Sequence, residues 1–145
     1  MNGEGDSIPE FEVENQDGEK VVSEKIGEAV IFFYPKADTP GCTKEACSFR
    51  DNIERLEDKR LGVYGVSTDS VEAQKEFAEK YNLNFDLLAD QDGDVAGKFG
   101  VLQESGYAER TTFILRDGEI EKVFRKVDPG EHLDEVIRYL RMNRK

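Results

Sequence analysis

The chain has only two cysteines, Cys42 and Cys47, and they lie five residues apart. Thr39 is a residue type that caps helices and Pro40 suits a first helical position, so the sequence predicts a helix that begins at Pro40. Cys42 would then be its third residue. The free amides and partial positive charge at a helix N-terminus favour a thiolate over a thiol. Because the thiolate is the nucleophilic form, we expect Cys42 to be reactive.

The spacing of the two cysteines places them on different faces of this helix. One inward face carries the residues at steps of four and three: Cys42, Ala46, Phe49, Ile53 and Leu56. Cys47 lies about 140° around the helix from Cys42 and about 7.5 Å along it. Disulfides rarely span Cα separations above about 7 Å, so the sulfurs can join only if the first turns unwind. The spacing therefore predicts a wound reduced form and a locally unwound oxidised form.

Spacing alone leaves other roles open for this pair. Cysteines in a helix are often small buried hydrophobes. A structural zinc site needs four ligands, and His132, the only histidine, lies in a distant segment, so we expect no metal and no other cofactor. The acidic turn Asp90–Asp94 resembles a calcium loop, but Val101 stands where the loop needs a bidentate Glu. We interpret it as a plain turn.

The whole chain alternates between strand-like and helix-like patterns, which predicts one α/β domain over residues 1–145. The expected strands are Phe11–Glu14, Lys20–Val22, Ala29–Tyr34, Gly62–Ser67, Phe85–Ala89, Thr111–Arg116 and Glu119–Lys126. The other expected helices are Val71–Tyr81 with Asp69 or Ser70 as its cap, Val95–Phe99, and a last helix opened by Asp128 and Pro129 with a stripe of Leu133, Val136, Ile137 and Leu140. This order predicts a central sheet with helices on both faces and an antiparallel hairpin at one side.

Composition restricts the class of partner. The net charge of −12 comes from 32 acidic and 20 basic residues, which indicates a soluble protein that does not bind nucleic acid. No apolar run approaches the roughly 20 residues needed to span a bilayer, so we expect no membrane association. The N-terminus lacks the pattern of a secretory signal, and we therefore expect a cytoplasmic protein.

The residues around Cys42 resemble a known active site. The pattern Pro35-x-x-x-Thr39-x-x-Cys42 resembles the signature of peroxiredoxins. The longer run FYPKADTPGCTKEAC is similar to the bacterioferritin comigratory protein, or peroxiredoxin Q, branch, which often carries its resolving cysteine where Cys47 stands. The resemblance extends from about residue 8 to residue 140. It implies a thioredoxin-like fold with a central mixed sheet, helices on both faces and an N-terminal β-hairpin.

The resemblance also implies roles for the residues in the run. Cys42 would be the peroxidatic nucleophile and Cys47 the resolving cysteine. Thr39 would place its hydroxyl near the thiolate and the peroxide oxygens, and Pro35 would shield the sulfur from water. The backbone amides of Gly41 and Cys42 would help to bind the substrate.

Two charged residues complete the implied site. Arg110, at the start of a strand, resembles the family's active-site arginine, and Glu45 resembles the acid that orients it. An arginine suits this position because its fork can hold two partners and stays charged. Together with the helix amides, Arg110 would favour the thiolate and stabilise the charge that spreads over two oxygens.

The implied activity is that of a thiol-dependent peroxidase acting on hydrogen peroxide and organic hydroperoxides. Cys42 would become a sulfenic acid and condense with Cys47 to an intramolecular disulfide. Thioredoxin or a glutaredoxin-like dithiol would reduce that disulfide. The branch resembled also implies a monomer.

Two other functions use the same cysteines. A thioredoxin-like disulfide reductase is disfavoured because it needs a C-x-x-C motif, and because Arg110-Thr111-Thr112 stands where thioredoxins carry a proline. A redox-sensing interaction protein, switched by Cys42 oxidation and local unwinding, stays open. Fast turnover with a recycling reductant would separate the enzyme from the sensor.

Overall fold

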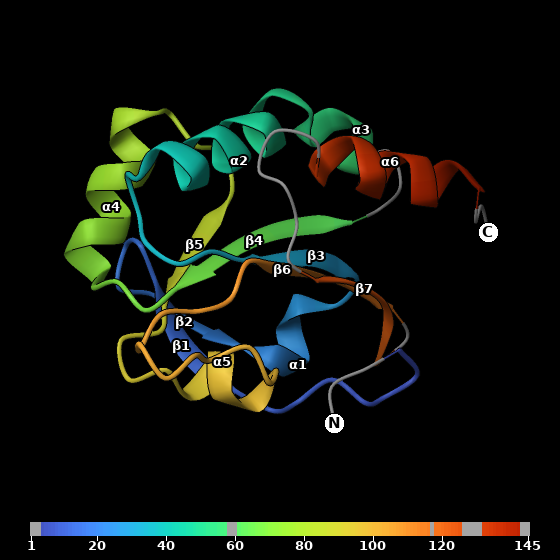
Figure 1. The fold of residues 1–145 in the computed structure, drawn as a ribbon, viewed down its shortest axis with the longest axis horizontal. Coiled ribbons are helices and arrows are strands. Elements are labelled where there is room, and N and C mark those ends of the chain that lie inside the picture. The colour runs from blue at the N-terminus through green and yellow to red at the C-terminus, as the bar shows by residue number, and fades with distance from the viewer. Residues whose placement is uncertain (1–3, 58–60, 117, 126–131, 143–145) are drawn as a thin grey trace.

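The computed structural model describes residues 4–57, 61–116, 118–125 and 132–142 (Figure 1). The strands are β1 (Glu12–Asn15), β2 (Lys20–Val22), β3 (Ala29–Phe33), β4 (Gly62–Ser67), β5 (Asp86–Ala89), β6 (Thr111–Arg116) and β7 (Glu119–Arg125). The helices are α1 (Ser23–Ile26), α2 (Pro40–Asp51), α3 (Ile53–Glu57), α4 (Val71–Lys80), α5 (Asp94–Lys98) and α6 (His132–Met142). The predicted strands are therefore confirmed to within one residue at each end.

Within the described residues the strands form one mixed sheet in the order β2-β1-β5-β4-β3-β6-β7. Strands β3, β4 and β5 pair in parallel at the centre, and the β1–β2 and β6–β7 hairpins form the two edges. Figure 1 shows α2, α3, α4 and α6 on one face of the sheet and α1 and α5 on the other. The predicted sheet with helices on both faces and an N-terminal hairpin is confirmed.

The central strand β3 is buried on both faces, as its unbroken apolar run predicts. Val30 and Phe32 face the cluster that includes α2, α4 and α6, whereas Ile31 and Phe33 face the cluster that includes α5. Parallel pairing of β3 with β4 and antiparallel pairing with β6 place β3 between two strands. The loop that follows β3 therefore starts from a strand that is paired on both sides and buried on both faces.

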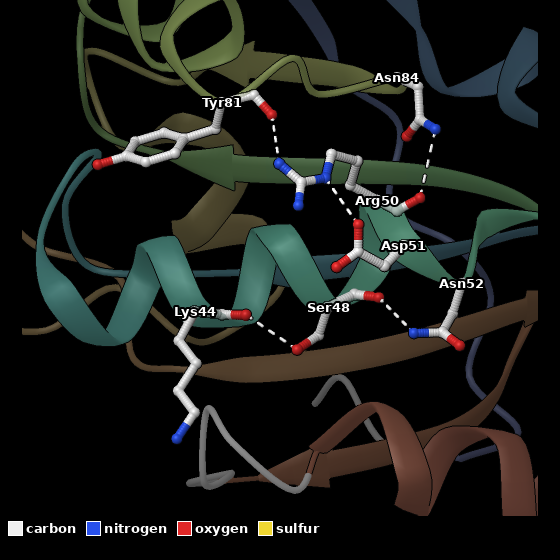
Figure 2. A network of polar contacts seen from close by, with 7 residues as sticks. All are labelled: Lys44, Ser48, Arg50, Asp51, Asn52, Tyr81 and Asn84. Atoms are coloured by element: carbon white, nitrogen blue, oxygen red, sulfur yellow. Dashed lines mark hydrogen bonds and ion pairs between the residues drawn. The ribbon is translucent and has the colours of Figure 1, made fainter.

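The predicted inward face of α2 is confirmed, but the predicted helix is not continuous to Leu56. Helix α2 ends at Asp51, the next residue, Asn52, has a non-helical backbone (φ −124°, ψ 15°), and α3 starts at Ile53. The side-chain amide of Asn52 donates to the Ser48 carbonyl at 2.9 Å (Figure 2). The backbone N–H of Asn52 donates to the Phe49 carbonyl. Asparagine competes for backbone groups in this way, which explains the break.

Other differences concern short or capping segments. Helix α1 has only four residues, too few for a periodic pattern to predict it. Ser70, not Asp69, caps α4 by accepting from the Ala73 N–H. The carboxylate of Asp90 accepts from two backbone amides at the start of α5. The acidic segment is thus a turn, as predicted, and its first carboxylate satisfies two free amides of α5.

The predicted opening of the last helix at Asp128 and Pro129 lies outside the described residues. Among the residues that the structure does describe, no group of three or more His, Cys, Asp or Glu could hold a metal ion. Within the same ranges, no helix has the length and apolar character needed to cross a membrane.

Candidate active site

The site begins where β3 ends. After Phe33 the chain makes a short loop, and Thr39 then adopts the extended backbone of an N-cap before Pro40 opens α2. Cys42 is the third residue of the helix, as predicted, and its side chain is only 1% exposed. The thiol therefore lies in the first turn, where unpaired helix amides favour negative charge.

The sheet register brings Arg110 to this point from 68 residues away in the sequence. Strands β3 and β6 are antiparallel, and Phe33 at the end of β3 lies opposite Thr111 at the start of β6. Arg110 therefore stands beside the chain that leads into α2. Its Nη2 donates to the Cys42 Sγ at 3.3 Å.

Glu45 holds the other side of the same guanidinium. Arg110 Nη1 donates to the Glu45 Oε1 at 2.7 Å, and Glu45 is 1% exposed. Glu45 follows Cys42 by three residues on α2, so the two side chains lie on one helix face. One arginine thus bridges the sulfur and the carboxylate, as the resemblance implied.

Burial and charge act against each other in this pair. Burial raises the pKa of Glu45 to about 7, although the charge and hydrogen bond of Arg110 oppose that shift. Burial by itself would lower the pKa of Arg110. Its interactions with Glu45 and Cys42 outweigh that effect, so the pKa of Arg110 is raised. Arg110 therefore stays charged beside the sulfur, which is what a thiolate and a developing oxyanion need.

The raised pKa of Glu45 predicts a pH-dependent stability. Its ordinary value is 4.5, and the folded-state value is about 7. Because the folded state binds the proton more tightly, the contribution of Glu45 is fully present below about pH 4.5 and is lost as the pH rises through about 7. Glu45→Gln is therefore expected to lose less Tm than the parent between about pH 5 and about pH 8 in thermal unfolding.

A matched control is Glu54→Gln, which changes an exposed glutamate on α3. This variant is expected to keep the pH dependence of the parent. If the Tm of Glu45→Gln and of the parent fall in parallel, the carboxyl of Glu45 does not titrate in this range.

The remaining predicted residues lie in the same segment. Thr39 is three residues before Cys42, and its hydroxyl donates to the Lys36 carbonyl at 2.9 Å. Pro35 and Gly41 are half-buried on either side of Thr39. Their roles toward a peroxide stay predictions, since they depend on a bound substrate.

Cys47 lies on a different side of α2 from Cys42. It is half-buried, Cys42 is buried, and both thiols are free. Both cysteines lie within helix α2, which is intact from Pro40 to Asp51. This arrangement corresponds to the reduced, wound form that the spacing predicts.

Sequence reasoning did not find the polar residues behind the site. Tyr34 is fully buried at the end of β3, and its hydroxyl donates to the Gln74 Oε1 at 2.5 Å. Asp69 accepts from the Ala37 N–H at 2.7 Å and from the Ser67 hydroxyl at 2.6 Å, which ties the loop before α2 to the end of β4. The sequence offered Asp69 only as one of two possible caps of α4, and Ser70 is the one that caps it.

Comparison with known proteins agrees with this geometry. Residues 5–123 match the AhpC/TSA family. The chain is 42% identical over 147 residues to peroxiredoxin Bcp of Escherichia coli strain K12, covering 94% of each protein. It is 37% identical to the chloroplastic peroxiredoxin Q of Sedum lineare, covering 94% of this chain and 76% of that protein.

Solved structures show the same fold. The crystal structure of peroxidoxin BcpB from Mycobacterium tuberculosis superposes with a TM-score of 0.92 at 36% identity, and each chain is covered completely. The bacterioferritin comigratory protein of Xanthomonas campestris gives a TM-score of 0.85 at 29% identity, covering 91% of this chain and 90% of that one. The thioredoxin-like fold is confirmed. The chain therefore belongs to the AhpC/TSA family, in its Bcp and peroxiredoxin Q branch of thiol-dependent peroxidases.

Proposed function

We propose that Cys42 is the peroxidatic cysteine of this peroxidase. Its thiolate attacks one oxygen of a peroxide, the O–O bond breaks, and the other oxygen leaves as hydroxide or alkoxide and takes up a proton. Cys42 becomes a sulfenic acid. The observation that carries this proposal is the contact of Arg110 with both the Cys42 sulfur, at 3.3 Å, and Glu45, at 2.7 Å.

Each neighbouring group has a part in this first step. Arg110 and the backbone amides of Gly41 and Cys42 stabilise the negative charge that moves from sulfur to the leaving oxygen. Glu45 orients Arg110 without touching the peroxide. We assign to the Thr39 hydroxyl a hydrogen bond to the bound peroxide and to Pro35 the exclusion of water from the sulfur.

In the second step Cys47 resolves the sulfenic acid. The Cys47 thiolate attacks the Cys42 sulfur, an S–S bond forms, and the sulfenic oxygen leaves as hydroxide, which a proton converts to water. The two cysteines lie on different sides of a wound helix, so this step requires the first turns of α2 to unwind. A dithiol of the thioredoxin or glutaredoxin type then transfers two electrons and restores both thiols.

The substrate class and setting follow the same proposal. We propose hydrogen peroxide and organic hydroperoxides as substrates, with support from the Xanthomonas campestris relative, whose structure concerns alkyl peroxide reduction by that protein. A thioredoxin-type reductant operates where thiols are kept reduced, so we place the cycle in the cytoplasm. We also propose a monomer, since every residue of the cycle comes from one chain.

Mass spectrometry after addition of one equivalent of hydrogen peroxide to the reduced protein tests this function. The parent is expected to lose about 2 Da and to give a peptide cross-linked between Cys42 and Cys47. Cys47→Ser is expected to hold a sulfenic acid on Cys42 that a dimedone-type reagent traps. Addition of thioredoxin, its reductase and excess peroxide is expected to give repeated turnover of the parent.

Two outcomes would contradict the assignment. If the parent stays reduced through seconds of exposure, Cys42 is not a peroxidatic cysteine. If Cys47 is oxidised first in the parent, the two roles are reversed. One slow stoichiometric oxidation without turnover would instead identify a redox sensor.

A further inference from the structure

Tyr81, the residue that follows α4, makes contacts with both ends of α2. Its hydroxyl donates to the Asp38 Oδ1 at 2.7 Å, and Asp38 lies two residues before the start of α2. Its backbone carbonyl accepts from Arg50 Nη1 at 2.6 Å, and Arg50 lies in the last turn of α2. Figure 2 shows the second contact, with the Tyr81 ring directed toward the opposite end of the helix. One residue therefore links the two ends of the helix that carries both cysteines.

The contact at Asp38 is exposed and easily released. The Asp38 carboxylate also accepts from Lys80 Nζ at 2.9 Å, but these side chains are 42% and 58% exposed. Hydrogen bonds from Lys80 and then Tyr81 lower the pKa of Asp38, so the carboxylate is charged. Exposed pairs of this kind contribute little each.

Asp38 also has an unusual backbone conformation. Its φ is +58°, in the left-handed region that residues with a Cβ rarely occupy. The strained residue immediately precedes Thr39, the N-cap of α2. Any unwinding that moves Cys42 toward Cys47 must move this loop.

The contact at Arg50 belongs to a fixed end. The Arg50 carbonyl also accepts from Asn84 Nδ2 at 3.3 Å, so both the side chain and the backbone of Arg50 hold the segment between α4 and β5 (Figure 2). The preceding residue, Phe49, is fully buried and stacks on Phe32 with ring centroids 4.5 Å apart. Cys47 lies only one turn before this fixed end.

We propose that Tyr81 is a positioning residue for the resolving step: its hydroxyl latches the loop before Cys42 in the wound state, and its carbonyl keeps the last turn of α2 in place when the first turns unwind. The Asp38 contacts break on unwinding, whereas the Arg50 contact persists. Cys42 then travels to a Cys47 that stays near its original position. This proposal rests on the peroxidatic role of Cys42 and deepens it.

The test is the competition between two fates of the Cys42 sulfenic acid. In one fate Cys47 attacks it and releases water; in the other a second peroxide oxidises it to a sulfinic acid and is itself reduced to water or an alcohol. Tyr81→Phe removes the hydroxyl and leaves the carbonyl. Disulfide formation is expected to become about threefold faster, and the sulfinic acid fraction at a given peroxide concentration is expected to fall in proportion.

Quenched flow with mass spectrometry measures both products, and the chain offers no tryptophan as an optical probe. Asp38→Gly removes the carboxylate that accepts from the Tyr81 hydroxyl, and glycine tolerates a φ of +58°, so this variant is expected to shift the competition in the same direction. Tyr139→Phe is the matched control, because it removes one hydroxyl that donates to Glu121 at 3.3 Å on a different pair of elements. That variant is expected to match the parent.

Removing the Arg50 contact at the last turn of α2 is expected to change the rate of disulfide formation in the opposite direction. Arg50→Met leaves Cys47 less well placed after unwinding, so disulfide formation is expected to become slower and sulfinic acid to increase. A purely structural role of Tyr81 or Arg50 would lower the Tm without changing the ratio of the two products. Thermal unfolding of each variant separates the two.

The outcomes distinguish this proposal from the proposed function. Sulfenic acid must form on Cys42 in every variant if the peroxidatic assignment is right, whatever the latch does. If the sulfenic acid forms but Tyr81→Phe gives the same product ratio as the parent and Tyr139→Phe, the Tyr81 hydroxyl does not hold the loop before Cys42. If Arg50→Met speeds disulfide formation, the Arg50 contact does not keep Cys47 in place for the resolving step.

Discussion

Arg110→Met is expected to lower the second-order rate constant for oxidation of Cys42 by hydrogen peroxide about 10²- to 10³-fold. Arg110 is the side chain that donates to the Cys42 sulfur, and removal of one such preorganised donor typically costs that factor. Arg110→Lys is expected to recover only part of the rate, because an ammonium cannot hold Glu45 and the sulfur with the geometry of a guanidinium. Competition against a reference peroxidase for limiting peroxide measures these constants.

The control for this prediction separates rate from stability. Arg110→Met leaves Glu45 buried without its partner, so the variant is expected to be less stable as well as slower. Adding Glu45→Gln removes the stranded carboxylate and is expected to restore the Tm but not the rate. A double variant that regains the parent's rate would show that Arg110 acts only through folding.

Phe49→Ala is expected to lower the free energy of unfolding by about 3–5 kcal/mol. The Phe49 side chain is fully buried between α2 and the sheet, and its ring is stacked on Phe32 with an interplanar angle of 10°. Truncation removes apolar burial and leaves a cavity that the rigid strand β3 cannot close. Equilibrium unfolding in urea, with the slope shared among variants, measures the change.

Tyr107→Ala is the comparison for this stability prediction. Tyr107 is 44% exposed, and its truncation is expected to change the free energy of unfolding by less than about 0.5 kcal/mol. A cost for Phe49→Ala of about 1 kcal/mol or less would mean that α2 relaxes into the space. The last turn of α2 would then not be the fixed end that our account of the resolving step requires.

Local rules explain how much of the fold the sequence alone predicts. The apolar run of β3 and the alternation with turn residues place the strands to within one residue. Thr39 and Pro40 place the start of α2 and therefore put Cys42 in its first turn. These features depend on neighbours a few residues apart. The sequence can therefore determine them without knowledge of the rest of the chain.

The features that sequence patterns miss are short or depend on distant partners. The break at Asn52 arises because one amide competes successfully for the Ser48 carbonyl, and a helical pattern of apolar residues continues across it. Helix α1 has only four residues, too few to show a helical pattern of apolar residues. Asp69 has the chemistry of a cap, but the loop before α2 uses it instead.

The site itself combines both levels. The types and spacing of Cys42 and Cys47 by themselves determine that a disulfide needs an unwound helix, because helical geometry separates the two sulfurs. Only the tertiary structure decides that Arg110 meets the sulfur, since that contact depends on the register of β3 against β6. Only the tertiary structure likewise places Tyr81 against both ends of α2, because packing of α4 beside α2 brings these distant residues into contact.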